Sequence, residues 1–117
     1  MAATYTRMSG AGIRSEKQVQ RDIAVFLGLL GYLVSDFSQP RATKQTPGIP
    51  DLHAMHPGHS GNHGHAIWIE VKAETGRMSP AQSAWHTAAR AAGQTVVVAR
   101  SAADLLAPLR ALGAPIP

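Results

Sequence analysis

The 117-residue sequence predicts a single α/β domain, with a mixed sheet of about four strands flanked by helices. Two segments open with Ser-x-x-Gln, a capping-box pattern that begins helices. Residues 66–72 (AIWIEVK) alternate β-branched side chains with others, as a strand with two different faces does. The elements follow the order helix, strand, strand, strand, helix, strand, helix, which favours helices packed on one sheet.

The first helix is expected to begin after Ser15, because Ser15 and Gln18 have capping-box spacing. Apolar residues then recur at helical spacing from Val19 onward, and Gly31 is expected to end the helix. Residues 1–14 lack such periodicity. They are therefore interpreted as a flexible, weakly basic arm, which leaves 15–117 as the domain.

Three short strands are expected next, at residues 32–37, 51–55 and 66–72. Residues 38–50 form a loop, and the second strand starts at the Pro-Asp step, where a proline need not donate to the sheet. The segment HPGHSGNHGH is rich in Gly and His and is interpreted as a hairpin connection between the second and third strands.

The C-terminal third is expected to add helix, strand and helix. Ser79 is the predicted N-cap of a helix that has Pro80 in its first position and ends at Gly93. A strand at 95–99 would then run parallel to 66–72 through a right-handed crossover. Ser101 is expected to cap the last helix, which Pro108 would kink or divide. The predicted apolar side of the 79–93 helix consists of Ala81, Ala84, Trp85, Ala88 and Ala92.

Composition narrows the function. Eleven Lys and Arg against seven Asp and Glu give a net charge of +4, which favours a polyanionic partner. Zero cysteines exclude disulfides and thiolate zinc sites and fit a reducing compartment. Aromatic residues make up only 5%, which argues against a base-stacking platform. No apolar stretch approaches the roughly 20 residues of a membrane span and no signal peptide is visible, so a cytoplasmic location without membrane contact is expected.

Charged residues at the end of the 66–72 strand indicate a chemical site. Glu70 and Lys72 share one face, whereas Val71 points to the other. If 51–55 pairs with 66–72 as a hairpin, Met55 lies near Ala66 and Asp51 near Glu70. Two converging carboxylates suit a hard cation such as Mg²⁺ or Mn²⁺, with the Val71 carbonyl as a third ligand. Lys72 could then orient or deprotonate a water molecule.

The motifs GIPD (48–51), IEVK (69–72) and SPAQ (79–82), in this placement, resemble the VRR-NUC family of the PD-(D/E)xK nuclease superfamily. The similarity is greatest to its short stand-alone form found in phages and prophages, and it spans about residues 15–106. It implies a restriction-endonuclease-like core with Asp51 and Glu70 as metal ligands and Lys72 as the catalytic lysine. Gln82 would be a polar residue beside the site, and Glu16 an acidic residue of the first helix that assists the metal.

The resemblance also implies an activity. The expected protein is a Mg²⁺- or Mn²⁺-dependent endonuclease that hydrolyses phosphodiester bonds in branched DNA, such as Holliday junctions, as a homodimer. If a phage or prophage encodes it, it would act in the cytoplasm of the bacterial host. Alternatives are a nuclease for flaps, nicks or RNA, a nucleic-acid-binding module on the same fold that does not cut, and a regulator that responds to metal through the histidine-rich loop. Cations expected to contact DNA phosphates are Arg14, Arg41, Lys44, Arg77 and Arg90.

Simpler interpretations exist for several of these residues. Glu70 and Lys72 could form only an ion pair at a strand end. Gln82 is already explained as a capping-box residue, and Glu16 is favoured at a helix start by the helix dipole. His86, one turn after Gln82, is expected to be exposed.

The tryptophans and the loop histidines also have simpler interpretations. Trp68 and Trp85 are interpreted as packing residues, although Trp68 shares a strand face with Glu70 and could wall the site. The four histidines of the hairpin connection are better explained by a solvated loop near the phosphate backbone than by a zinc or nickel site, because its glycines would have to be ordered. These histidines are His56, His59, His63 and His65.

Overall fold

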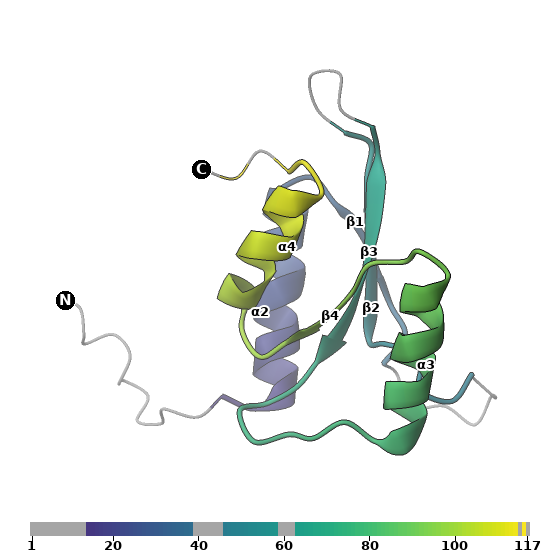
Figure 1. The fold of residues 1–117 in the computed structure, drawn as a ribbon. Coiled ribbons are helices and arrows are strands. Elements are labelled where there is room, and N and C mark those ends of the chain that lie inside the picture. The colour runs from purple at the N-terminus through teal and green to yellow at the C-terminus, as the bar shows by residue number, and fades with distance from the viewer. Residues whose placement is uncertain (1–13, 39–45, 59–62, 115, 117) are drawn as a thin grey trace.

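The computed structural model describes residues 14–38, 46–58, 63–114 and 116 (Figure 1). Most of the predicted arm, the loop residues Arg41 and Lys44, and His59 lie outside these ranges. The elements are α2 (Glu16–Leu29), β1 (Leu33–Asp36), β2 (Leu52–His56), β3 (His65–Val71), α3 (Pro80–Ala91), β4 (Val96–Ala99), the 3₁₀ helix η1 (Ala102–Leu105) and α4 (Leu106–Ala111).

The four strands form one mixed sheet in the order β1-β2-β3-β4. The first two neighbouring pairs are antiparallel, and β3 and β4 are parallel, joined by α3. Met55 pairs with Ala66 and Leu52 with Ile69, which confirms the predicted hairpin register and places Asp51 opposite Glu70. The α/β fold class and the restriction-endonuclease-like core are therefore confirmed.

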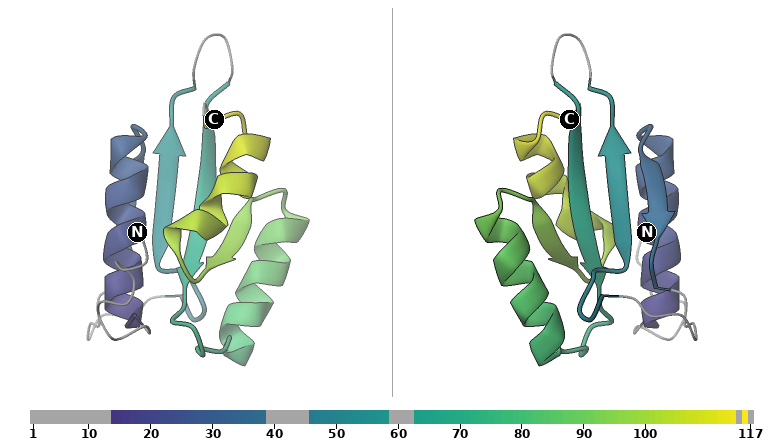
Figure 2. Two further views of the ribbon diagram at one scale, coloured as in Figure 1. Left: turned by 90° about the vertical axis from the view of Figure 1, so that its left-hand side faces the viewer. Right: turned by 90° about the vertical axis from the view of Figure 1, so that its right-hand side faces the viewer.

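Helices cover both faces of this sheet. α2, η1 and α4 lie on one face and α3 lies on the other, as the three views of Figures 1 and 2 show. The apolar core lies under α2 and α4. It is built from Val19, Ile23 and Leu27 of α2, Ile67, Ile69 and Val71 of β3, and Leu105 and Leu109 of the C-terminal helices. The residues that alternate with these on β3 face α3 instead.

The ends of α2 form as the sequence predicts. Ser15 Oγ accepts a hydrogen bond from Gln18 N at 3.1 Å, and Gln18 Oε1 accepts one from Ser15 N at 2.8 Å. At the other end Gly31 adopts a positive φ of 91°, while Tyr32 N donates to the carbonyl of Leu27. This arrangement satisfies the last carbonyls of the helix and turns the chain into β1.

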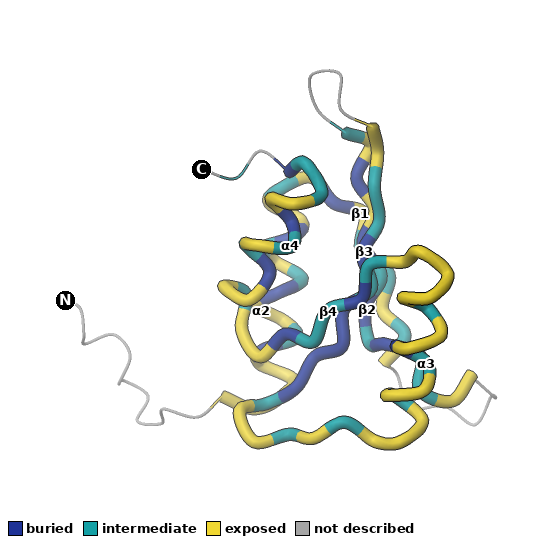
Figure 3. The backbone as a smooth tube through the Cα atoms, in the orientation of Figure 1, coloured by how far each residue is buried: buried dark blue, intermediate teal, exposed yellow. Residues whose placement is uncertain are grey.

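The predicted apolar side of α3 is wrong except for Trp85, which packs against Trp68 of the sheet. Ala81, Ala84, Ala88 and Ala92 are exposed, and Figure 3 colours most residues of this helix as exposed. The residues that face the sheet are Gln82, Trp85, His86 and Ala89. Alanine methyl groups bury little apolar area, so larger side chains determine which side of the helix packs inward.

The C-terminal helix also departs from expectation. Ser101 makes no side-chain capping bond, and a turn of 3₁₀ helix precedes α4. The helix is divided at Leu105, three residues before Pro108, which itself lies inside α4. Pro108 has no N–H for the carbonyl of Asp104 and would crowd it, so the turn before it is tightened to 3₁₀ geometry.

Candidate active site

Asp51 lies at the entrance to β2, and its carboxylate reaches across to β3. Asp51 Oδ2 accepts a hydrogen bond from Val71 N at 2.8 Å. In an extended strand the N–H and C=O of one residue point to the same side, so the Val71 carbonyl also faces β2. The end of β3 therefore turns a backbone oxygen toward the strand that carries Asp51.

Glu70 and Lys72 lie on the face of β3 covered by α3, and both are buried, with exposed fractions of 1% and 8%. Gln82 joins them from α3. Its Nε2 donates to Glu70 Oε2 at 3.0 Å, and its Oε1 accepts from Lys72 Nζ at 2.9 Å. Lys72 Nζ lies 3.9 Å from Glu70 Oε2, so the amide holds the two charged groups side by side.

Gln82 also completes the capping box of α3. Its Oε1 accepts from Ser79 N at 2.9 Å, while Ser79 Oγ accepts from Gln82 N at 3.1 Å. The capping role and the place beside the site therefore coexist in one side chain. Because the cap fixes the Gln82 amide, its hydrogen bonds set the positions of Glu70 and Lys72.

The loop that leads into Asp51 packs directly on the first turn of α3. Gly48 has a φ of 83°, and a Cβ atom there would overlap the carbonyl of Ala81 and lie 2.9 Å from Gln82 N. Pro50, next to Asp51, is fully buried. Gly48 therefore permits a close backbone approach that brings Asp51 and Gln82 to the same end of the sheet.

His86 was expected to be exposed, and the structure shows the opposite. Its exposed fraction is 2%, and Nε2 lies 3.5 Å from Glu70 Oε1. It lies one helical turn after Gln82, so the two share the side of α3 that faces β3. The spacing of Gln82 and His86 predicts a buried His86 only if the Gln82 side of α3 faces the sheet, and the sequence does not show which side does.

Burial and neighbouring charge govern protonation at this site. Desolvation, followed by the hydrogen bond and charge of Asp51, raises the pKa of Glu70 to about 8, although Lys72 opposes the shift. Glu16 contributes weakly in the same direction as Asp51. Burial, then Arg90 and Lys72, lower the pKa of His86. At neutral pH without a cation, a protonated Glu70 therefore faces a neutral His86.

The donor atoms at this end of the sheet fit a hard cation. Glu70 Oε1 and His86 Nε2 are buried, and neither has a hydrogen-bond partner within the described ranges. A cation would relieve the repulsion that Asp51 exerts on a charged Glu70. No group of three or more His, Cys, Asp or Glu side chains is assembled in the part of the chain that the structure describes. The oxygen atoms that could hold such a cation here are those of the Asp51 and Glu70 carboxylates and the Val71 carbonyl, and a role for Glu16 stays a prediction.

The family model for the VRR-NUC domain matches residues 29–103, which is more than half of the chain. The chain belongs to the VRR-NUC family. This membership indicates a nuclease of the PD-(D/E)xK type with DNA as its substrate, and nucleases of that superfamily generally depend on divalent metals. The matched span contains Asp51, Glu70, Lys72 and Gln82 and excludes Glu16. No curated protein matches the chain.

Three of the cations predicted to contact DNA lie within the described residues, Arg77 and Arg90 inside the span that matches the VRR-NUC family and Arg14 before it. Arg77 is exposed in the segment between β3 and α3. Arg14 pairs with Asp22 at 2.8 Å, and Arg90 Nη2 donates to the carbonyl of Val96 at 2.9 Å. Arg77 makes no side-chain hydrogen bond or ion pair with the residues that the structure describes, whereas Arg14 and Arg90 also support local structure.

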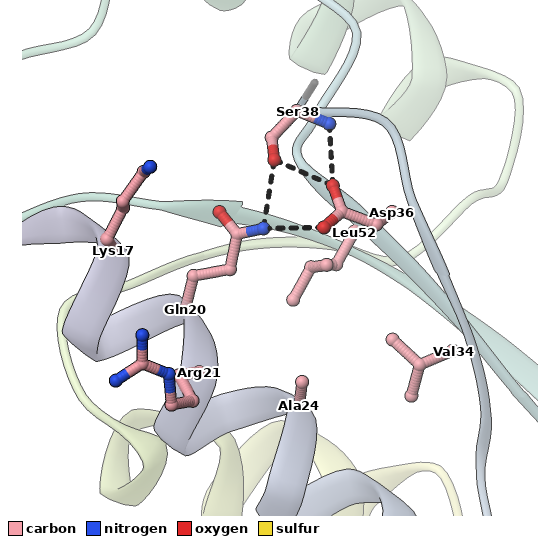
Figure 4. Close-up of a pocket in the computed structure, with 8 residues that line it drawn as sticks. All are labelled: Lys17, Gln20, Arg21, Ala24, Val34, Asp36, Ser38 and Leu52. Carbon is pink, nitrogen blue, oxygen red and sulfur yellow. Dashed lines mark hydrogen bonds between the residues drawn. The ribbon is translucent and has the colours of Figure 1, made fainter.

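A cavity of about 470 Å³ lies on the opposite face of the sheet, between α2 and the first two strands (Figure 4). Lys17 and Arg21 line it beside a polar network in which Gln20 Nε2 donates to Asp36 Oδ2 at 3.0 Å and to Ser38 Oγ at 2.9 Å. Its lining includes none of the predicted catalytic residues. The cavity is therefore separate from the candidate active site.

The hairpin histidines lie at the far end of the β2–β3 ladder. His56 pairs with His65, and their rings stack with centroids 5.7 Å apart. Tyr32 Oη lies 2.6 Å from His65 Nε2. Both strands extend one residue further than predicted, so the expectation of a solvated loop is wrong for the buried His56.

No helix within the described ranges is long and apolar enough to cross a membrane.

Proposed function

We propose that this chain is a metal-dependent DNA endonuclease that hydrolyses phosphodiester bonds. Asp51, Glu70 and the Val71 carbonyl would hold Mg²⁺ or Mn²⁺, which prefer oxygen ligands and retain several waters. The observation that carries the proposal is the convergence of Asp51, Glu70 and Lys72 at one end of the sheet, fixed by the hydrogen bonds from Val71 and Gln82.

When bound, the cation would lower the pKa of water and stabilise negative charge on a phosphate oxygen. The protein's own contribution begins with Glu70, which must lose its proton to act as a ligand. The Gln82 amide keeps the carboxylate oriented through the hydrogen bond to Oε2. His86 lies against the other oxygen, Oε1, and limits its movement.

Lys72 would position the attacking water and offset charge on the phosphate. Its ammonium group is held by Gln82 Oε1 and lies beside Glu70, so only part of its hydrogen-bonding capacity is used within the protein. A buried, preorganised cation stabilises developing negative charge more strongly than a solvated one, because little reorganisation is needed.

The substrate we favour is branched DNA, such as a Holliday junction, cut by a homodimer. One domain of this size covers only part of a duplex, and two copies would supply a cut on each of two strands. The net charge of +4 supports a sequence-independent hold on phosphates, to which Arg14, Arg41, Lys44, Arg77 and Arg90 would contribute. Glu16 would assist the cation through a water molecule.

The test uses substitutions that preserve side-chain shape. Asp51→Asn, Glu70→Gln and Lys72→Met should each lower cleavage at least a hundredfold, about the cost of losing one preorganised catalytic contact, without unfolding the protein. Glu74→Gln, which neutralises an exposed carboxylate just beyond β3, is the matched control and should cleave normally. Undiminished metal-dependent cleavage by purified Glu70→Gln would exclude this assignment.

The substrate class is tested with labelled junctions, flaps, nicked duplex, linear duplex and single strands, each with Mg²⁺, Mn²⁺ or EDTA. Junction cleavage that requires metal, by a species of dimer mass in sedimentation, is the expected result. Preferential cleavage of flaps or nicks would keep the chemistry and replace the substrate. Binding without strand loss under every condition would instead favour a non-cleaving module.

A further inference from the structure

A shallow apolar notch opens between α3 and the sheet. Its volume is about 370 Å³, and it is lined by Trp68, Trp85, Ala88, Ala89 and Gln94. The indole rings meet almost at right angles, with centroids 5.0 Å apart and planes inclined by 68°. Two half-exposed indoles set edge to face form a corner against which a flat ring can stack on one face and be held at its edge.

Two residues that line the notch are close neighbours, along the chain, of residues in the candidate active site. Trp68 precedes Glu70 by two residues on the same strand face, a separation of about 7 Å. Trp85 directly precedes His86, whose ring lies against Glu70. An occupant of the notch would therefore lie within roughly two base steps of the carboxylates, since stacked bases are about 3.4 Å apart along a strand.

More aromatic rings continue from Trp68 toward Asp51. His53 and Phe37 have ring centroids 4.3 Å and 5.7 Å from that of Trp68. Phe37 N donates to the carbonyl of Asp51. Low aromatic content argues against base stacking, but the structure gathers three of the six Phe, Trp and Tyr residues, Phe37, Trp68 and Trp85, in one cluster.

The lining chemistry favours a neutral, planar ring with polar edges. The notch walls are two indoles and two alanine methyl groups, and Gln94 supplies an amide that can both donate and accept. None of the lining side chains carries a formal charge, so the notch does not suit a phosphate. The volume of the notch accommodates one nucleobase, but the notch is too shallow to receive a duplex.

We propose that this notch receives an unpaired nucleobase of the DNA substrate, beside the phosphodiester that is cut. The inference rests on the proposed nuclease function and adds a feature that the substrate must present. A base within a duplex would first have to be unpaired and unstacked, which costs binding energy, whereas a base at a branch or bulge is already accessible. Stacking on an aromatic side chain then increases affinity roughly tenfold.

The experiment measures binding without cleavage, in EDTA, so that it does not depend on catalysis. Three labelled duplexes are compared: one fully paired, one with a single extra unpaired 2-aminopurine nucleotide, and one with an extra abasic nucleotide. The wild-type protein should bind the 2-aminopurine duplex about tenfold more tightly than the other two and quench its fluorescence. Ala88→Leu fills the notch from an exposed helical position, and Ala84→Leu, one turn earlier and outside the notch, is its matched control.

Ala88→Leu should abolish the preference and the quenching while retaining wild-type affinity for the paired duplex, and Ala84→Leu should behave as wild type. Equal affinity for the three duplexes, or an unchanged preference in Ala88→Leu, would overturn the proposal. So would a change in sedimenting mass caused by Ala88→Leu, because the notch would then be a contact between copies of the chain. If the wild-type protein showed this base preference but cleaved no DNA in the presence of metal, only the proposed nuclease function would be refuted.

Discussion

At Glu70, burial and the carboxylate of Asp51 both disfavour the charged form, and this couples the protein's stability to pH. Because the pKa is raised from its ordinary value to about 8, the folded state binds this proton more tightly than the unfolded state does. Without metal, the stabilising contribution of protonated Glu70 to the free energy of unfolding is fully present at acidic pH. It declines as pH rises toward about 8, by up to about 1.4 kcal/mol per pH unit.

Glu70→Gln should remove this decline, because an amide does not titrate and can keep the hydrogen bond from Gln82. We therefore expect the free energy of unfolding of Glu70→Gln to exceed that of the wild type increasingly between pH 5 and 8. Denaturant unfolding in EDTA measures it, and Glu74→Gln, at an exposed position, should follow the wild-type curve. Parallel curves for wild type and Glu70→Gln would show that Glu70 is ionised throughout this range.

Individual residues were predictable where strand geometry determined their position. Asp51, Glu70 and Lys72 could be brought together because alternation and hairpin register follow from the sequence. The buried position of His86 could not be predicted, because a histidine on an alanine-rich helix gives no sign of which side packs inward. Only the contact with Glu70 reveals it.

Because the 46–50 loop packs on the first turn of α3, adding one methyl group at Gly48 should strongly lower the free energy of unfolding. Gly48→Ala requires a positive φ and also creates an overlap with the carbonyl of Ala81. We expect it to lower the free energy of unfolding by about 2–4 kcal/mol, the combined cost of left-handed backbone and overpacking. Chemical denaturation measures this loss.

Gly93→Ala separates the two causes. Gly93 has a nearly identical φ of 85°, but a Cβ atom there would have no neighbour within 4 Å. Gly93→Ala should therefore lower the free energy of unfolding by only about 1–2 kcal/mol, the cost of a left-handed backbone. Gly48→Ala should also weaken cleavage, because Asp51 and Gln82 would move apart, and Gly93→Ala should not. Equal destabilisation by both substitutions would mean that the loop does not pack on α3 as described.

Secondary structure was predictable to within a residue or two where local chemistry controls it. Both Ser-Gln capping boxes form, and the glycine at the end of α2 adopts the conformation that stops the helix. The orientation of α3 was not predictable from the same rules. Its many alanines carry weak hydrophobic signals, so the contacts of Trp85 with Trp68 decide its orientation.

Across the whole molecule, the β2–β3 ladder separates two clusters of side chains. Asp51 and Glu70 lie at one end, and the stacked His56 and His65 lie at the other. Five residue steps of a strand divide them, a distance of about 17 Å. The proposed catalytic end therefore does not depend on the hairpin connection for its contacts, and a metal-responsive role of that connection can be tested separately.

Replacing residues 57–64 with Asn-Gly would join His56 to His65 by a two-residue turn of the kind that closes hairpins. We expect metal-dependent cleavage within about threefold of wild type, since Asp51, Glu70, Lys72 and Gln82 keep their contacts and only phosphate contacts from the connection are lost. Initial cleavage rates on one junction substrate measure this, with Glu70→Gln as the inactive control and circular dichroism to verify folding. A folded but inactive variant would place the histidine-rich connection in the catalytic machinery and favour a function governed by its metal binding.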